Sequence, residues 1–418
     1  MKKQLIQPVK GTRDFYPEQM ALRVWLYNAI RAVSERFGYQ EYEGPILEYI
    51  ALYAAKSGEE LVKEQSFVLT DRGGDELTLR PELTPTLARM VAQRQNVLPK
   101  PIRWWSFGPF WRYERPQKGR TREFFQWNID LIGSKSVQAD AEIAATSAEF
   151  FRSVGLGPEM VRIQVNNRRL MDAQLRAMGI EGALVSAVFK VIDKREKMND
   201  QAWGEYAASV GLSPAQTEGL RTMLGDRELW KQSDELVAFF AALADLGVSE
   251  YFEFEPSVIR GLDYYTGTVM EGRDQKGGRA IFGGGRYDNL VSDVGGDPLP
   301  GVGFAMGDVV ISLVLQEYGK MPSFKTSPTQ VLIAAFDANL SGAARRLAAQ
   351  WRAEGLRVEL YPDVAKLDRQ LKYADAKSIP FVAILGPDEV ATNSVMLKDL
   401  RIKSQQRVAQ SEVAQLTR

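Results

Sequence analysis

The chain of 418 residues contains no cysteine and no histidine. The absence of cysteine excludes disulfides, thiolate nucleophiles and cysteine-based metal sites. The absence of histidine excludes a serine–histidine triad and metal sites with imidazole ligands. Any catalysis must therefore use arginine, lysine, carboxylate, tyrosine and backbone groups. Such groups suit reactions that depend on positioning and charge stabilisation, as phosphoryl and nucleotidyl transfer do.

The sequence also lacks a net charge and long apolar runs. Its 53 lysines and arginines balance 53 aspartates and glutamates, so no global positive field marks a nucleic-acid partner. Any such contact must use a local basic patch. No apolar run has the length that a membrane span needs, and residues 1–10 lack the apolar core of a signal peptide. We therefore expect a cytoplasmic protein that does not enter a membrane.

Hydrophobic periodicity divides the chain into segments. Strand patterns at residues 101–114 and 123–132 flank a basic loop and predict an antiparallel hairpin. Residues 160–247 are mostly helical in pattern and predict an inserted helical module. Beyond residues 320–329, which contain two prolines, strands and helices alternate as in a small α/β domain. We expect an α+β protein with a domain at 1–320 (helical insertion at about 160–248), a linker at 321–329 and a second domain at 330–418.

The segment RGLDYYTG, residues 260–267, holds the densest set of ligand-binding groups. Arginine grips phosphate or carboxylate through paired hydrogen bonds. Tyrosine offers a flat face and a hydroxyl, and glycine lets the backbone approach a ligand closely. The segment predicts a site that holds an anionic group beside a small polar ring. The alternative is an ordinary strand with a turn.

Three more segments carry candidate groups. In LRPELTP, residues 79–85, an extended strand would place Glu82 and Thr84 on one face, suited to a substrate ammonium; a solvent-facing loop is the alternative. In the hairpin, arginines suit phosphates and an aromatic suits a base, against the alternative of a solvated charged hairpin. Its even-numbered candidates are Arg112, Glu114, Arg120, Arg122, Phe124 and Gln126. The glycine runs at 283–285 and 303–307 lack the flanks of dinucleotide or phosphate loops and fit close backbone approach within a site.

These segments together resemble the histidyl-tRNA synthetases, a family of class II aminoacyl-tRNA synthetases. The similar stretches are GTRDFYP (11–17), LRPELTP (79–85), RYERPQKGRTREFFQ (112–126), RGLDYYTGTVMEG (260–272), FGGGRYDNLV (282–291) and QLKYADAKSIPFVAILGPDE (370–389). They span nearly the whole chain in the family's order. The resemblance implies a class II catalytic domain on an antiparallel sheet, with a helical insertion, and a C-terminal α/β anticodon-binding domain.

The resemblance also implies the activity and the partners. Histidine would react with ATP, with Mg²⁺ present, to give histidyl-adenylate and pyrophosphate, and the histidyl group would then pass to histidine tRNA. The family works as a homodimer. The segment from Tyr39 to Tyr49, which reads as extended and contains Pro45, fits an edge strand or an interface.

Roles for single residues follow from the same motifs. Arg112 would hold the α-phosphate, and Arg260 would lie beside that phosphate and the histidine carboxylate. Phe124 would stack on adenine. The other histidine-binding candidates are Glu82, Thr84 and Gln126 for the amino group and Asp130, Tyr264 and Tyr265 for the imidazole. The other ATP-binding candidates are Glu114, Arg120 and Gly303.

The sequence departs from the family at two positions. The family's third motif normally carries Glu-Arg shortly after Gly-Phe-Ala-Met-Gly, but here Val310 occupies the arginine position. Arg286 and Arg120 are our candidates for the missing charge. Asp130 stands where the family usually has glutamate. A synthetase-like histidine-binding regulatory subunit of histidine biosynthesis, which does not charge tRNA, is the alternative function, and a tRNA-sensing module is a third.

Overall fold

The structure is a computed structural model. It describes residues 5–54, 65–117, 119–195, 198–259, 264–276, 280–324 and 327–417. By their internal contacts, residues 1–14 and 23–321 form one compact unit, and residues 15–22 and 322–418 form the other. Each unit is described by itself below. Among the described residues, no helix has the length and apolar character needed to cross a membrane.

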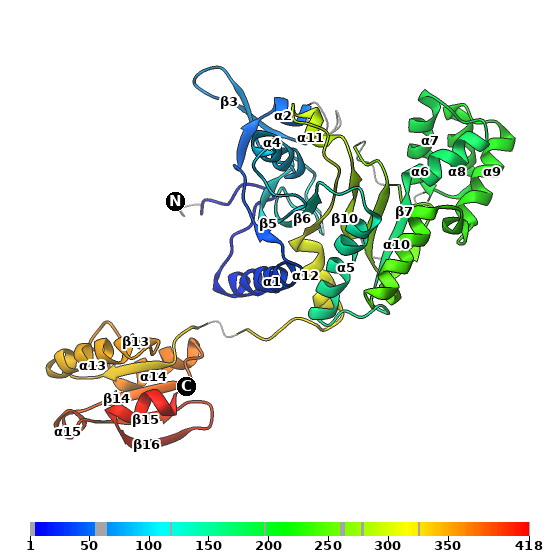
Figure 1. The fold of residues 1–418 in the computed structure, drawn as a ribbon. Helices are drawn as coiled ribbons and strands as arrows, with labels where there is room; N and C mark the ends of the chain where they lie inside the picture. Colours follow the sequence, from blue (N-terminus) through cyan, green and yellow to red (C-terminus); the bar gives the residue numbers. More distant parts are fainter. Residues whose placement is uncertain are drawn as a thin grey trace. The chain divides into compact units, whose positions relative to one another are not determined.

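The larger unit is built on a sheet of eight strands (Figure 1). All neighbours pair antiparallel except at the two edges, where β1 pairs with β5 and β7 pairs with β8 in parallel. This arrangement confirms the predicted α+β class with an antiparallel sheet. In spatial order the strands are β1 (Gln40–Glu41), β5 (Ile102–Trp111), β6 (Glu123–Ile132), β11 (Gly301–Gly307), β10 (Ala280–Tyr287), β9 (Thr268–Asp274), β7 (Val161–Asn167) and β8 (Phe252–Phe254).

Helices cover both faces of this sheet. On one face α1 (Pro17–Arg36), α5 (Val137–Ser153) and α12 (Asp308–Glu317) bury apolar residues against Trp105, Trp127 and Ile129 of the central strands. On the other face α4 (Thr84–Arg94) and α11 (Leu290–Asp293) pack around Ile132 and Tyr287. The two faces of the central strands therefore meet different cores. Polar residues on the second face remain available for a site.

The segment expected to be mostly helical begins with a strand. Val161, Ile163 and Val165 of β7 are buried in the core on one face of the sheet and alternate with the less buried Arg162 and Gln164. This period of two is the strand signal that the helical surroundings obscured. Helices follow this strand. They are α6 (Arg168–Ala177), α7 (Ala183–Asp193), α8 (Asp200–Val210), α9 (Pro214–Gly225) and α10 (Asp234–Asp245), with the 3-10 turns η2 (Leu229–Gln232) and η3 (Ser249–Tyr251). In Figure 1 the helices labelled α6 to α9 lie together at one end of the unit, and α10 lies beside α5.

A smaller sheet holds β2 (Leu47–Tyr49), β4 (Glu76–Leu79) and β3 (Phe67–Thr70) in that order, beside the short helix α2 (Ala51–Ala54). Its registers place Leu47 opposite Leu79 and Tyr49 opposite Leu77. The predicted extended segment from Tyr39 to Tyr49 thus forms two short strands, β1 and β2, on either side of Pro45.

The second unit carries a five-stranded sheet in the order β13-β12-β14-β15-β16. The predicted strand–helix alternation corresponds to its parallel part, β13, β12 and β14, and two antiparallel strands follow. The elements are β12 (Val331–Ala335), η4 (Ala338–Leu340), α13 (Ser341–Ala353), β13 (Val358–Leu360), α14 (Leu367–Ala376), β14 (Phe381–Leu385), α15 (Pro387–Ala391), β15 (Ser394–Asp399), β16 (Ser404–Ala409), η5 (Gln410–Glu412) and α16 (Val413–Leu416).

Candidate active site

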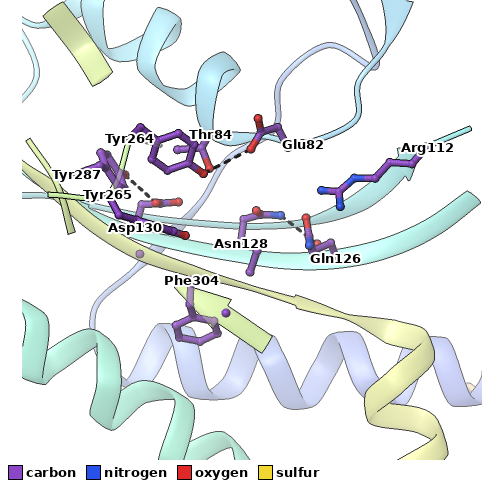
Figure 2. Close-up of a pocket in the computed structure, with 13 residues that line it drawn as sticks. Glu82, Thr84, Arg112, Gln126, Asn128, Asp130, Tyr264, Tyr265, Tyr287 and Phe304 are labelled. Carbon is purple, nitrogen blue, oxygen red and sulfur yellow. Dashed lines mark hydrogen bonds between the residues drawn. The ribbon is translucent and has the colours of Figure 1, made fainter. Parts of the chain in front are cut away.

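A cavity of about 190 Å³ opens on the α4 face of the large sheet (Figure 2). Its floor comes from the adjacent strands β6, β11 and β10, and its roof comes from the turn before α4 and from the residues that precede β9. The lining residues are Glu82, Thr84, Arg112, Gln126, Asn128, Asp130, Tyr264, Tyr265, Gly283, Tyr287, Gly303, Phe304 and Ala305.

Strand β6 supplies a polar row to the floor. Gln126, Asn128 and Asp130 alternate along the strand, so their side chains share one face, and all three line the cavity. The residues between them, Trp127 and Ile129, point into the opposite core. The strand therefore separates an apolar core from a polar site by its pleat alone.

Asp130 lies at the closed end of this row. It is buried, and the hydroxyl of Tyr287 donates a 2.7 Å hydrogen bond to its Oδ1. Burial raises the pKa of Asp130 to about 7, against the opposing effect of the hydrogen bond from Tyr287. At neutral pH this carboxyl therefore exists in both protonation states, so it can accept a hydrogen bond from an imidazole or donate one to it.

Gly303 makes room for Asp130. The two residues are paired across β6 and β11, and a Cβ built on Gly303 would lie 2.1 Å from Asp130 Oδ1. It would also lie 2.5 Å from the backbone oxygen of Ile129. Any side chain at 303 would displace the carboxylate, so this position requires glycine because of close approach.

Tyr264 closes the cavity from above. Its ring packs edge-on against Tyr265 at 4.9 Å between centroids, and its hydroxyl donates a long 3.5 Å hydrogen bond to Oε2 of Glu82. Burial, followed by the charge of Glu82, raises the pKa of Tyr264 well above its ordinary value. The hydroxyl thus stays protonated and is available as a donor near neutral pH.

Glu82 and Thr84 reach the cavity by a different route from the one expected. We predicted an extended strand, but β4 ends at Leu79 and α4 begins at Thr84. That prediction was wrong because Pro85, which lies in the first turn of α4, favours the start of a helix. Both side chains nevertheless line the cavity.

Arg112 lies at the other end of the cavity from Asp130 (Figure 2). Its Nε donates a 2.9 Å hydrogen bond to the carbonyl oxygen of Pro81. Its guanidinium carbon lies 5.4 Å from the centroid of the Phe124 ring. This hydrogen bond to the backbone holds the guanidinium in one orientation at the edge of the site. A guanidinium held in this way can form paired hydrogen bonds with a phosphate.

The remaining candidates among the described residues do not line this cavity. Glu114 and Arg120 pair with each other at 3.2 Å, and Phe124 stacks on Phe110 with 5.8 Å between centroids. Arg112, Glu114, Arg120 and Arg122 lie beyond the ends of β5 and β6, so the expected common strand face does not extend to them. Arg260 lies outside the described residues.

Sequence reasoning missed some of the lining residues. Asn128 has the same parity as Gln126 and Asp130 on β6, so a strict count along the strand would have found it. Tyr287 gave no such signal, since its contact with Asp130 joins residues 157 positions apart. Gly283, Phe304 and Ala305 belong to the two glycine runs that were predicted to approach a site closely, and they line the cavity.

Comparison with known families identifies this arrangement. A model of histidyl-tRNA synthetase matches residues 11–307, and a model of the anticodon-binding domain matches residues 330–418. The chain belongs to the histidyl-tRNA synthetase family. Residues 11–307 include both sheets of the large unit and every described residue that lines the cavity. The cavity therefore lies within the segment that matches the synthetase model.

Individual relatives cover the synthetase sequence almost end to end. It is 37% identical to a histidine–tRNA ligase of Opitutus terrae, across 99% of this chain and 98% of the relative. It is 38% identical to a chloroplastic/mitochondrial histidine–tRNA ligase of Arabidopsis thaliana, across 99% of this chain and 87% of the relative. The crystal structure of a histidyl-tRNA synthetase from Nostoc superposes with a TM-score of 0.84 at 26% identity, covering 100% and 99% of the two chains.

Val310 occupies the position where the family's third motif normally has an arginine, and the structure shows what surrounds it. Val310 lies on α12 and packs against the apolar core. Asp308, two residues earlier, is buried; its Oδ1 accepts the backbone N–H of Phe125 at 2.9 Å, and its Oδ2 pairs with Arg13 at 2.8 Å. The start of α12 is thus tied to β6 and to the GTRDFYP segment.

Arg286 does not replace the missing arginine. Its guanidinium is buried and donates to Asp140 Oδ1 at 3.0 Å and to the backbone oxygens of Ser134 and Ser136 at 2.9 and 3.1 Å. These bonds fasten the end of β10 to the start of α5. Our suggestion of Arg286 was wrong because its hydrogen-bonding groups face the protein interior. Arg120 remains largely exposed beside Glu114.

Proposed function

We propose that this chain attaches histidine to histidine tRNA through a histidyl-adenylate intermediate, with ATP as the second substrate. The observation that carries the proposal is the cavity that joins Asp130 and Tyr287 at one end to Arg112 at the other, in a chain of this family. One end offers acidic and phenolic partners for an imidazole, and the other offers a fixed cation for a phosphate.

The first step needs no general base. A carboxylate oxygen of histidine attacks the α-phosphorus of ATP, a new P–O bond forms, and the bond to the leaving pyrophosphate breaks. The nucleophile is already ionised, so catalysis rests on alignment and on stabilisation of charge at the phosphate. Arg112 and Arg260 are the proposed cations at that phosphate. This chemistry is compatible with a chain that has no histidine.

We assign the recognition of histidine to two groups of residues in the cavity. Glu82, Thr84 and Gln126 take the amino group, as acceptors for an ammonium. Asp130, Tyr264 and Tyr265 take the imidazole, because a buried polar partner rejects analogues that lack an N–H group. Gly303, assigned from the sequence to ATP binding, lines the cavity opposite Asp130. Glu114, Arg120 and Phe124 are assigned to ATP outside this cavity, with Phe124 stacked on adenine.

Mg²⁺ is proposed to enter with ATP. This ion usually keeps several waters and is bound through phosphates and one or two carboxylates rather than in an all-protein cage. The described residues hold no group of three or more acidic side chains suited to a metal. We propose that the ion is carried by the nucleotide, where it would neutralise charge on the phosphates.

We assign tRNA binding to both parts of the chain. Residues 1–320 are proposed as the catalytic domain, with the insertion at about 160–248, and residues 321–329 as the linker. Residues 330–418 are proposed to read the anticodon, supported by the family match over that range. Arg120 and Arg122, on the loop between β5 and β6, are proposed to meet the acceptor end of the tRNA.

A homodimer is supported by the small sheet. Cross-strand partners in an antiparallel sheet point to one face, so its registers place six apolar side chains together. Leu47, Tyr49 and Leu69 are each more than 40% exposed. The six are Leu47, Leu79, Phe67, Tyr49, Leu77 and Leu69. Such a contiguous apolar face is typical of a protein–protein interface, and we propose a second copy of this chain as the partner.

The decisive experiment is ATP–pyrophosphate exchange by the purified chain with each of the twenty amino acids. We expect exchange with histidine alone, followed by transfer to histidine tRNA. Val310 favours the alternative of a histidine-binding regulatory subunit, since valine cannot pair with a phosphate. Histidine binding without exchange would overturn the proposed activity and support that alternative.

A further inference from the structure

Asn128 lines the candidate active site, yet the reaction proposed above gives it no role. It lies on β6 between Gln126 and Asp130, and the pleat of the strand places the three side chains on one face. Figure 2 shows the Asn128 side chain between the other two. Asn128 is therefore the middle group of the polar row on the floor of the cavity.

The carboxamide of Asn128 is buried and holds an unpaired acceptor. The residue is 3% exposed, and its amide nitrogen donates one long hydrogen bond, of 3.5 Å, to the carbonyl oxygen of Gln126. Its amide oxygen accepts no hydrogen bond from the part of the chain that the structure describes. A buried acceptor without a donor is costly, because hydration has been lost and nothing replaces it. An N–H group of a ligand in the cavity would supply the missing donor.

The neighbouring carboxyl leaves room for such a partner. Asp130 Oδ1 already accepts the hydroxyl of Tyr287 at 2.7 Å, so one oxygen remains for a ligand. An imidazole carries two ring nitrogens, and each needs a hydrogen-bond partner when it is buried. When Asp130 is protonated it donates to one of them, which leaves the ring N–H on the other nitrogen and in need of an acceptor. Asn128 is the next polar side chain along the row.

The order of the row indicates which nitrogen this is. The step rests on the proposed function, in which Gln126 takes the amino group of histidine and Asp130 takes the imidazole. In histidine Nδ1 is closer along the covalent chain to the amino group than Nε2 is. A histidine that extends from Gln126 to Asp130 therefore brings Nδ1 to Asn128 and Nε2 to Asp130.

We propose that Asn128 determines specificity for histidine, with its amide oxygen accepting a hydrogen bond from the Nδ1–H group of the ligand. An analogue without this N–H group would leave the oxygen unpaired in a buried site, which is the kind of contact that rejects a close analogue most strongly. The imidazole is then recognised by two residues of one strand, Asn128 and Asp130, rather than by the carboxyl alone.

Two pyrrole analogues of histidine test the proposal by titration calorimetry of the full chain. β-(Pyrrol-2-yl)-L-alanine keeps an N–H group only at the Nδ1 position, and β-(pyrrol-3-yl)-L-alanine keeps one only at the Nε2 position. Asn128→Ala should weaken binding of histidine and of the 2-yl analogue about tenfold, as loss of a buried hydrogen bond does, and should leave the 3-yl analogue unchanged. Asn96→Ala, at an exposed position just after α4, is the control and should bind all three ligands as the parent does.

A second variant separates ligand binding from support of the strand. Asn128→Asp keeps an oxygen acceptor but cannot donate to Gln126, so it should bind the 2-yl analogue more tightly than Asn128→Ala does. Equal weakening of both analogues by Asn128→Ala, or no weakening of either, would overturn the proposal, as would a parent chain that binds neither histidine nor the analogues. Calorimetry needs no catalysis. A chain that binds histidine without pyrophosphate exchange would therefore fail the proposed activity, while the pyrrole pair would still decide the role of Asn128.

Discussion

The hydroxyl of Tyr287 on β10 donates a hydrogen bond to Asp130 on β6, although β11 lies between the two strands. Two glycines of β11 leave the space for this contact. A Cβ at Gly301 would lie 2.3 Å from the Tyr287 ring, and a Cβ at Gly303 would lie 2.1 Å from Asp130 Oδ1. The acidic end of the candidate active site therefore depends on a strand that contributes no charge.

The first prediction concerns this glycine strand. Gly303→Ala should displace Asp130 and lower kcat/KM for histidine by about 10²-fold, the usual cost of misplacing a group by about 1 Å. Gly307→Ala is the matched control, because a Cβ there meets nothing within 4 Å. Pyrophosphate exchange at varied histidine concentration measures both. Equal activity of the two variants would contradict the proposed role of Asp130.

The raised pKa of Asp130 predicts a pH dependence of stability. The folded carboxyl titrates at about 7, whereas its ordinary value is 3.8. The folded state therefore holds a proton that the unfolded chain releases between these values, and this group's contribution to stability falls as pH rises, by at most about 1.4 kcal/mol per pH unit. Asp130→Asn should gain stability relative to the parent between pH 5 and pH 8.

Urea unfolding midpoints at pH 5, 6, 7 and 8 would measure this change. Asp245→Asn serves as the control, since Asp245 is an exposed carboxylate at the end of α10. Its difference from the parent should vary less with pH than that of Asp130→Asn. Parallel curves for Asp130→Asn and the parent would show that Asp130 is ionised throughout this range.

How far the sequence predicts the site depends on the kind of contact. Gln126 and Asp130 were predictable, because the pleat of one strand puts them on one face. Glu82 was found from its motif, while its local structure was misjudged at Pro85. Tyr287 was not predictable from pattern. Its role comes from the order β6-β11-β10, which brings together residues that no local periodicity relates.

The role of Arg286 also could not be predicted from its place in the sequence. In the sequence it stands beside a glycine run and resembles a ligand group, yet it is 4% exposed and pairs with Asp140. Position near a motif does not reveal which way a side chain points from β10. Burial decided its role, because a guanidinium that is fully engaged inside the protein cannot also hold a phosphate.

Loss of the buried pair should destabilise the large unit. Arg286→Met leaves the charge of Asp140 buried without its partner, and we expect a loss of about 3–5 kcal/mol in unfolding free energy. Adding Asp140→Leu should restore part of it, because both charges are then removed. Arg31→Ala, which breaks the exposed pair with Glu35, is the control and should leave the unfolding midpoint near that of the parent.

The apolar face of the small sheet predicts the oligomeric state. Light scattering after gel filtration should give twice the chain mass of 46.8 kDa for the parent. Leu69→Asp places a charge among the exposed apolar residues and should shift the protein toward monomer. Val237→Asp, at an exposed apolar position on α10, should remain dimeric. A monomeric parent would contradict the proposed interface.

The last prediction separates charge from geometry at Arg112. Lysine keeps the positive charge, but it cannot bond to Pro81 and present a planar fork to a phosphate at the same time. Arg112→Lys should therefore lower the rate of pyrophosphate exchange by about 10²-fold, as loss of a positioned donor does. Arg120→Lys, at a largely exposed position, should have a smaller effect on exchange. If both lysine variants keep the parent rate, Arg112 does not hold the α-phosphate, and the assignment of that end of the cavity fails.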